Sequence, residues 1–238
     1  MLFTIIPLFF FVDHSPLTKG DEFYRAQDYT SAMELYHSYI KAYPNDVEAY
    51  WRMARASICA GDICEKNKQE QYYRNALEAS STAVRLDSTH SNAQCWYAVS
   101  MGYIALFEGS RKKVELCNSI QKALTISITV DPRNDVAYSI YGSFYRALGN
   151  ISWMERQLAY LLLGGLPKGG YEDAERMLLK AIELAPNILR HRYELGLLYF
   201  DWGKEEKGKE VFRSALLLPQ TLASDKHRIE DMKQKLLL

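Results

Sequence analysis

Small apolar residues recur along this chain at the spacing of one helical face, and the clearest case is the segment 171–186. Within it Ala174, Leu178 and Ala181 lie at positions i, i+4 and i+7, which share one stripe of an α-helix. Two of the three are alanines, so a neighbouring helix can approach closely there. Pro186 ends the segment, because proline lacks the backbone N–H and clashes with the preceding turn. The pattern predicts a helix that packs through a small-residue stripe and ends at Pro186.

The same arrangement occurs in other parts of the chain. In the segment 29–44, Ala32 and Pro44 take the places of the first stripe residue and the terminating proline. Ala76 and Ala83 form a similar stripe further on. A period of roughly 34 residues, apart from insertions, is typical of tetratricopeptide repeats. We therefore expect an all-α fold, a tetratricopeptide-like superhelical solenoid of about five helix-turn-helix repeats.

The expected repeats form a single domain over residues 13–238. Helical stripes, glycines and prolines place their boundaries at 13–46, 47–90, 91–134, 135–188 and 189–222. A final amphipathic stretch, 223–238, is predicted to be a capping helix, because the last repeat of a solenoid needs one polar outer face.

One stretch contradicts the helical pattern locally. Leu124–Val130 alternates apolar and polar residues and is rich in β-branched side chains, which is a strand signature. It lies directly before the Asp131-Pro132 pair that ends its repeat. We predict a helix here, because tertiary context often overrides local propensity.

Two insertions interrupt the repeat period. The first, Asp62–Glu70, is polar and separates a helix ending at Gly61 from one expected over Tyr72–Leu86. The second, Asn150–Gly170, holds an amphipathic stretch, Ile151–Leu163, that predicts an extra helix in repeat four. A glycine-rich turn follows that stretch.

Residues 1–12 are almost entirely apolar. The run is too short to cross a membrane as a helix, and it resembles the hydrophobic region of a secretory signal, although no basic region precedes it. We expect a signal-like or anchor segment, which favours an exported or membrane-anchored protein over a cytoplasmic one. A strand or helix docked on the fold is the alternative.

Charge and cysteine content exclude several function classes. The formal net charge is zero, so nothing in the overall charge favours nucleic acid as a partner. The four cysteines form no C-x-x-C pair, and we predict no metal site. Cys95 and Cys117 are expected to be buried free thiols. Cys59 and Cys64 flank a Gly-Asp turn and are the pair more able to form a disulfide.

Catalytic and cofactor motifs are absent from the sequence. Gly164 and Gly169 have the spacing of a phosphate-binding loop, but Gly170 replaces its lysine and no strand precedes it. There is no H-E-x-x-H and no G-x-S-x-G motif. We therefore predict a protein that is not an enzyme and that needs no cofactor.

The positive functional prediction concerns the concave surface. The first helix of each repeat lines the inside of such a solenoid, and mixed aromatic and arginine side chains there are suited to binding a protein or peptide. Arginines can also hold a carboxylate or phosphate through forked hydrogen bonds. A solvated polar face is the alternative explanation for each single residue. The predicted groove residues are Trp51, Arg55, Val99, Tyr103, Ser139, Ser143, Arg146, Arg190, Tyr193 and Leu197.

Several segments resemble one known family. Ser152–Ala159, Gly165–Pro167 and Tyr171–Ala174, supported by Trp96–Ala98, Asp131-Pro132 and the tail from Ser224, are similar to the regulator of microtubule dynamics family. The resemblance covers roughly residues 91–238. It implies a tetratricopeptide-like fold with an added helix in the fourth repeat. Family members are linked to microtubules and organelle contact sites, and some related domains bind phospholipid.

A lipid or amphiphile carrier is the alternative function. The apolar stretch 151–166, with Trp153, Leu158 and Leu161–Leu163, could roof a cavity for an apolar ligand. Packing of this stretch against the solenoid explains the same pattern without a ligand.

Overall fold

The computed structural model describes residues 15–237, except 153–155, 158 and 162–164. Every regular element in these described ranges is helical, and none is a strand. The helices are α1 (Ser15–Arg25), α2 (Tyr29–Ala42), α3 (Val47–Gly61), α4 (Lys66–Leu86), α5 (Ser91–Glu108), α6 (Ser110–Val130), α7 (Asp135–Gly149), α9 (Tyr171–Leu184), α10 (Leu189–Asp201), α11 (Glu205–Ala215) and α12 (Asp225–Leu237). The predicted all-α solenoid is confirmed.

Polar side chains fix where several helices begin. Asp28 accepts the Ser31 N–H at 3.1 Å before α2, and Asn134 accepts the Ala137 N–H at 3.0 Å before α7. At the start of α5, the Nδ1 atom of His90 accepts the Ala93 N–H at 3.2 Å. Each bond satisfies a donor that the first turn of a helix leaves unpaired. Side-chain caps of this kind therefore help to set the starts of α2, α5 and α7.

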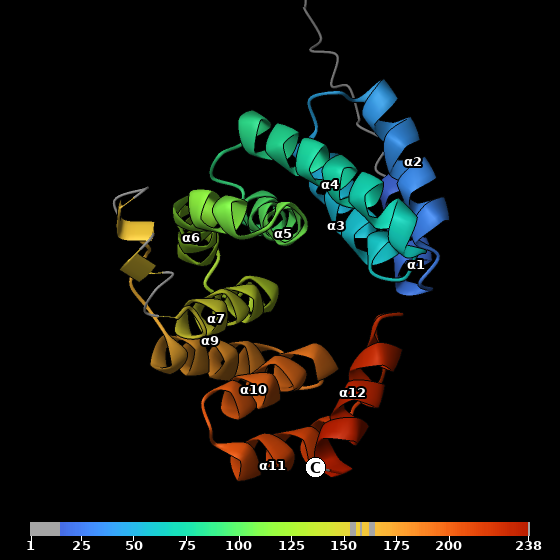
Figure 1. Ribbon diagram of the computed structural model, residues 1–238. Helices are drawn as coiled ribbons and strands as arrows, with labels where there is room; N and C mark the ends of the chain where they lie inside the picture. Colours follow the sequence, from blue (N-terminus) through green and yellow to red (C-terminus); the bar gives the residue numbers. More distant parts are fainter. Residues whose placement is uncertain (1–14, 153–155, 158, 162–164, 238) are drawn as a thin grey trace, which may run out of the picture.

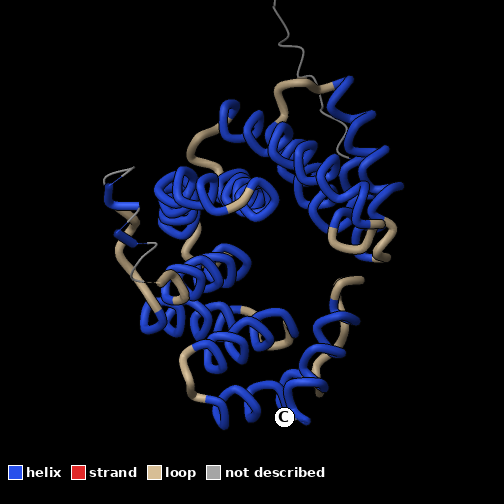
Figure 2. The backbone as a smooth tube through the Cα atoms, viewed as in Figure 1, coloured by secondary structure: helices blue, strands red, loops and turns tan. Residues whose placement is uncertain are grey.

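Consecutive helices pack in pairs, α1 with α2, α3 with α4, α5 with α6, α7 with α9 and α10 with α11. The pairs follow one another around a curve, and α12 then returns toward the first repeats (Figure 1). The backbone tube in the same view consequently has the outline of a nearly closed ring (Figure 2). The core lies along the seams of the pairs, where the stripe residues Ala32, Ala83, Ala174, Leu178 and Ala181 are fully buried.

The stretch Leu124–Val130 is helical, as its place in the repeat predicted. Leu124 and Ser127 are completely buried, and Ser127 Oγ donates to the Ser91 carbonyl oxygen at 2.9 Å. The hydroxyls of Thr125 and Thr129 donate to the carbonyl oxygens four residues earlier. The threonine hydroxyls are thus satisfied within the helix, and burial of Leu124 and Ser127 against neighbouring helices outweighs the local alternation that favours a strand.

The polar stretch 62–70 differs from its prediction. Helix α4 begins at Lys66, so most of the expected insertion is an extension of that helix. Its Lys, Gln and Glu residues have good helix propensity, and Arg74 forms an ion pair at 2.7 Å with Glu70, one turn earlier. Only a short turn, including Ile63 and Cys64, separates α3 from α4.

All four cysteines are free thiols, so the pair Cys59 and Cys64 does not form a disulfide. Cys59 is buried in α3, where its Sγ lies 3.4 Å from the Tyr24 hydroxyl oxygen. Cys64 points back to the Gly61 carbonyl oxygen at 3.4 Å. The two side chains therefore face different partners.

Two predicted segments fall wholly or partly outside the described residues. The signal-like segment 1–12 lies wholly outside them, and the expected helix 151–163 lies partly outside them. Of its described residues, 156–157 and 159–161 are helical, whereas 151–152 are not. None of the described helices is long and apolar enough to span a bilayer.

Candidate functional site

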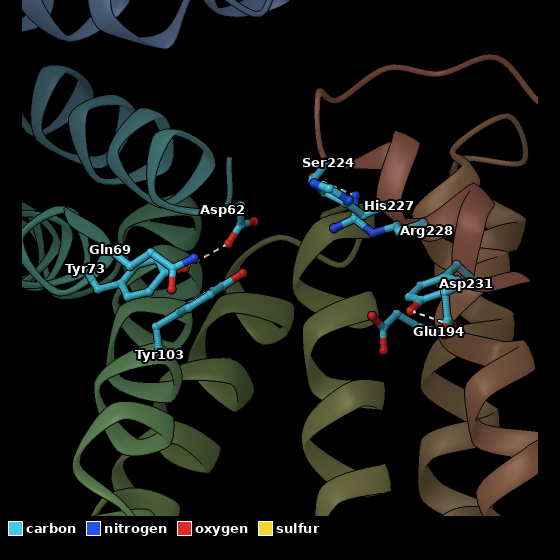
Figure 3. A pocket seen from close by; sticks show the side chains of 10 residues that line it. Asp62, Gln69, Tyr73, Tyr103, Glu194, Ser224, His227, Arg228 and Asp231 are labelled. Atoms are coloured by element: carbon cyan, nitrogen blue, oxygen red, sulfur yellow. Dashed lines mark hydrogen bonds between the residues drawn. The ribbon is translucent and has the colours of Figure 1, made fainter. Parts of the chain in front are cut away.

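A cavity of about 420 Å³ lies inside the ring. One wall comes from the turn after α3 and from α4 and α5, and the other comes from α10, α12 and the segment before α12 (Figure 3). Acidic side chains and tyrosines predominate, and none of the lining residues is aliphatic. They are Asp62, Gln69, Tyr73, Tyr103, Tyr193, Glu194, Ser224, His227, Arg228 and Asp231.

The first wall is organised around Asp62, the residue that follows α3. Tyr73 donates its hydroxyl to Asp62 at 3.3 Å, and the rings of Tyr73 and Tyr103 lie with centroids 4.4 Å apart. Burial raises the pKa of Asp62, while hydrogen bonds from Tyr103 and Tyr73 oppose the rise. Burial and the neighbouring Asp62 carboxylate raise the pKa of Tyr103 well above its ordinary value. This wall presents a partly desolvated carboxylate at the hydroxyl ends of two packed phenol rings.

The second wall repeats the pairing of a phenol with a carboxylate. Tyr193 on α10 donates its hydroxyl to Asp231 on α12 at 3.1 Å. Arg228 faces the same space and pairs with the fully buried Asp225 at 2.8 Å. The cavity is thus bordered on both sides by aromatic rings whose hydroxyls already have acceptors. Tyr73 packs against Tyr103, and Tyr193 stacks on Phe212, so each ring is held in place by a neighbouring ring.

Ser143 and Arg146 share one acidic partner on α10. Ser143 Oγ donates to Glu194 at 2.9 Å, and Arg146 approaches the same carboxylate at 3.3 Å. Arg146 also pairs with Asp201 at 3.2 Å. These bonds join α7 to α10, so both predicted groove residues connect neighbouring repeats.

Arg55 and Trp51 are likewise held by neighbours. Arg55 pairs with Asp21 of α1 at 2.6 Å, and its guanidinium carbon lies 3.8 Å from the centroid of the Tyr24 ring. Trp51 is only 7% exposed, and its indole N–H donates to Glu48 at 3.0 Å. Trp51 belongs to the core between the second and third helix pairs and does not line the cavity.

Arg190 differs from the other two predicted arginines. Within the described residues it makes no ion pair, whereas Arg55 and Arg146 do. The buried Nε atoms of all three lack a hydrogen-bond partner. Its positive charge opposes the rise that burial causes in the pKa of Asp62, which follows α3. At the start of α7 it adds to the hydrogen bond from His191 that lowers the pKa of Asp135. Arg190 therefore acts on two carboxylates from a distance and forms no ion pair among the described residues, and it does not line the cavity.

The remaining predicted groove residues face the packed interior. Val99 is 6% exposed within the core, and Leu197 packs against the cluster of Phe212 and Met232. Ser139 is completely buried. Of the predicted set, Tyr103 and Tyr193 are the two that line the cavity.

Sequence reasoning missed the contribution of α12. Four residues, Ser224, His227, Arg228 and Asp231, line the cavity because α12 turns back toward the first repeats and forms one side of the ring. Their amphipathic spacing predicted a capping helix, but no local pattern says which surface a cap also covers. Asp62 was missed because it was placed in an insertion.

No group of three or more His, Cys, Asp or Glu side chains in the described part of the chain is placed to hold a metal ion. The acidic residues of the cavity are bound by tyrosines and arginines instead. The arrangement is suited to binding through aromatic faces and charged hydrogen bonds.

One solved structure is similar over nearly the whole fold. A thermophilic tetratricopeptide protein of Thermus thermophilus aligns with a TM-score of 0.65 and 21% sequence identity, covering 94% of this chain and 99% of that one. At this level of identity the likeness establishes the fold alone.

Curated relatives match in sequence over most of the chain. The human regulator of microtubule dynamics protein 2 is 26% identical over 225 residues, which are 94% of this chain and 53% of the relative. The bovine regulator of microtubule dynamics protein 3 is 30% identical over 189 residues, covering 77% of this chain and 40% of the relative. The chain thus spans about half the length of these relatives.

The family match extends further toward the N-terminus than the resemblance in the sequence suggested. The family model for regulator of microtubule dynamics proteins 1–3 matches residues 17–237, which include the first two helix pairs. With the solenoid and its cavity, this match leads to one conclusion: the chain belongs to the regulator of microtubule dynamics family.

Proposed function

We propose that this chain is a non-enzymatic scaffold that binds a protein or peptide segment in the cavity of its ring. The observation that carries the proposal is the composition of the two walls, where Tyr73, Tyr103 and Tyr193 surround an open space between charged groups. Tyrosine and arginine, together with tryptophan, are enriched among the residues that carry most of the binding energy of protein interfaces. Solenoids of this class serve as extended concave binding surfaces.

Of the three predicted arginines, Arg190 is the one best suited to hold an acidic group of the partner, although it is not a lining residue of the cavity. Arg55 and Arg146 would each have to leave an internal carboxylate before binding another one. Arg190 has no such ion pair in the described structure, so it can form forked hydrogen bonds to a carboxylate without first breaking a contact. Tyr193 lies three residues further along the same helix and offers an aromatic face beside it.

A pull-down with purified chain tests this proposal. The relatives are named for microtubule dynamics, so tubulin and microtubule-associated proteins are the first partners to offer. We expect Arg190→Ala and Tyr193→Ala each to reduce capture at least ten-fold. Arg213→Ala, at an exposed position on α11, is the matched control and should bind normally. Equal capture by all variants, with circular dichroism unchanged, would remove the cavity from the function.

A lipid or amphiphile carrier is the second candidate. Its support is the exposure of the described apolar side chains in the fourth-repeat insertion, Tyr160 at 67% and Leu161 at 79%. The polar lining of the cavity favours the peptide instead. Native mass spectrometry of the purified chain distinguishes them, since a carrier would retain lipid of defined mass and a peptide scaffold would not.

A further inference from the structure

The two ends of the solenoid touch through the segment 221–224, named here the closing strap. Leu222 and Ala223 pack against an apolar cluster of Tyr29, Cys59 and Ala60 on α2 and α3. The Ala223 N–H donates to the Tyr29 hydroxyl oxygen at 3.2 Å, across 194 positions of sequence. The strap is the contact that closes the ring next to the start of α12 (Figure 1).

Asp225 shapes the strap for this contact. Its carboxylate is completely buried and accepts the N–H groups of Thr221 and Leu222, both at 2.9 Å. Arg228 balances its charge at 2.8 Å. A buried carboxylate with charged and backbone donors holds a defined local conformation, so the strap is already shaped before it meets Tyr29.

The closing strap lies between a strong contact and a weak one. Behind it, α12 is anchored to the last repeat by Met232, which is completely buried with Leu189 and Phe212. In front, the contact with α2 and α3 consists of two small or medium apolar side chains and one neutral hydrogen bond. A second hollow of about 250 Å³, lined partly by Tyr29 and Ala60, adjoins this contact. The front contact is therefore the one that opens first.

Opening the strap would change the cavity directly. Ser224 in the strap and Arg228 just after it belong to the second wall and would move with the strap. Asp62 and Tyr73 belong to the first wall and would stay with α3 and α4 (Figure 3). We propose that the closing strap is a clasp, which releases Tyr29 to admit a partner between the two walls and then closes over it. The admission of a partner rests on the proposed function, while the opening of the strap does not.

Cys59 reports opening without any ligand. It is 7% exposed beneath the strap, and burial raises the pKa of its thiol to about 11, so it reacts slowly while covered. Labelling with a maleimide, followed by peptide mass mapping, gives its rate in the full chain. Tyr29→Phe removes the acceptor of the Ala223 N–H and keeps the ring. It should raise the rate about five-fold, the factor expected for one neutral hydrogen bond.

A second variant and two controls separate clasp opening from unfolding. Ala223→Asp places a charge in the apolar contact and should raise the Cys59 rate more than Tyr29→Phe does. Tyr50→Phe loses an exposed hydroxyl that donates to Pro44 at 3.1 Å and should leave the rate unchanged. Cys95, completely buried elsewhere, must keep its rate in every variant, because a change there signals unfolding.

Two results would overturn the clasp. One is a Cys59 rate that Tyr29→Phe and Ala223→Asp both leave at the unaltered value. The other result requires a captured partner. It is faster labelling of Cys59 in Tyr29→Phe while the partner dissociates from this variant no faster than from the unaltered chain. If no partner is captured, the proposed function fails, and the Cys59 rates still decide whether the strap opens.

Discussion

The close approach of α7 and α9 depends on the absence of a side chain at Gly142. A Cβ added there would lie 2.8 Å from Leu178 Cδ2, closer still to Leu178 Cγ, and 3.2 Å from the Ala174 carbonyl oxygen. Leu178 and Ala174 are completely buried. Neither can move aside into solvent, so Gly142→Ala must push the two helices apart.

Opposing effects determine the size of the change. Replacing glycine by alanine within a helix normally stabilises it by about 0.5–1 kcal/mol. Overfilling a packed seam costs about 1–3 kcal/mol, so Gly142→Ala should be destabilising by about 1–2 kcal/mol. Gly102→Ala is the matched control, because Gly102 lies inside α5 and its Cβ would meet no atom within 4 Å. That variant should gain about 0.5–1 kcal/mol.

Urea unfolding followed by circular dichroism compares the variants. With a typical slope of about 1–3 kcal/mol per molar urea, the two midpoints should differ by about 1 M and lie on opposite sides of the unaltered chain. The reasoning is refuted if Gly142→Ala unfolds at the same or higher urea than the unaltered chain while Gly102→Ala behaves normally. That result would mean that the seam has free space which the structure does not contain.

Two further variants test other contacts. Met232→Ala should lower stability by about 2–4 kcal/mol, because it empties a completely buried site between α12 and the last repeat; a urea midpoint that stays in place contradicts this anchoring role. A hydrogen bond from His90, aided by Arg52, lowers the pKa of Glu48 to about 2 from 4.5. Because the folded-state pKa is the lower one, this stabilisation is present above about pH 4.5 and is lost as the pH falls toward 2. The Glu48 side chain is 37% exposed, so screening limits the effect to about 1 kcal/mol. Thermal melts of Glu48→Gln should therefore show a flatter decline over this range than the unaltered chain, and parallel declines would exclude the contribution.

The helix pairs could be predicted because their signals are local. Stripe residues such as Ala174 and Ala181 and the terminating Pro186 lie within one helix and its end, and a repeated period shows which helices pair. The start of α4 could not be placed as well. Its polar residues suit either a loop or an exposed helix, and only packing of the following turns against α3 and α5 decides between them.

The candidate site was harder to predict than the fold because its partners come from distant repeats. Register alone placed Arg55 and Arg190 on equivalent inward faces. Asp21, 34 residues earlier, forms an ion pair with Arg55, whereas no described carboxylate pairs with Arg190. A repeat position therefore tells where a side chain points, and the neighbouring repeats decide whether it is available.

Contacts between distant repeats also explain why the candidate site depends on α12. Without it, the first wall would present Asp62 and its two tyrosines to open solvent, where exposed charges bind weakly. With α12 in place, Asp231 and Arg228 face that wall across a cavity of about 420 Å³, and burial raises the pKa of Asp62. Lower local dielectric strengthens each polar contact that a ligand makes there. The helix that sequence patterning predicts as a cap thus supplies both half of the cavity and the environment that makes its charged groups effective.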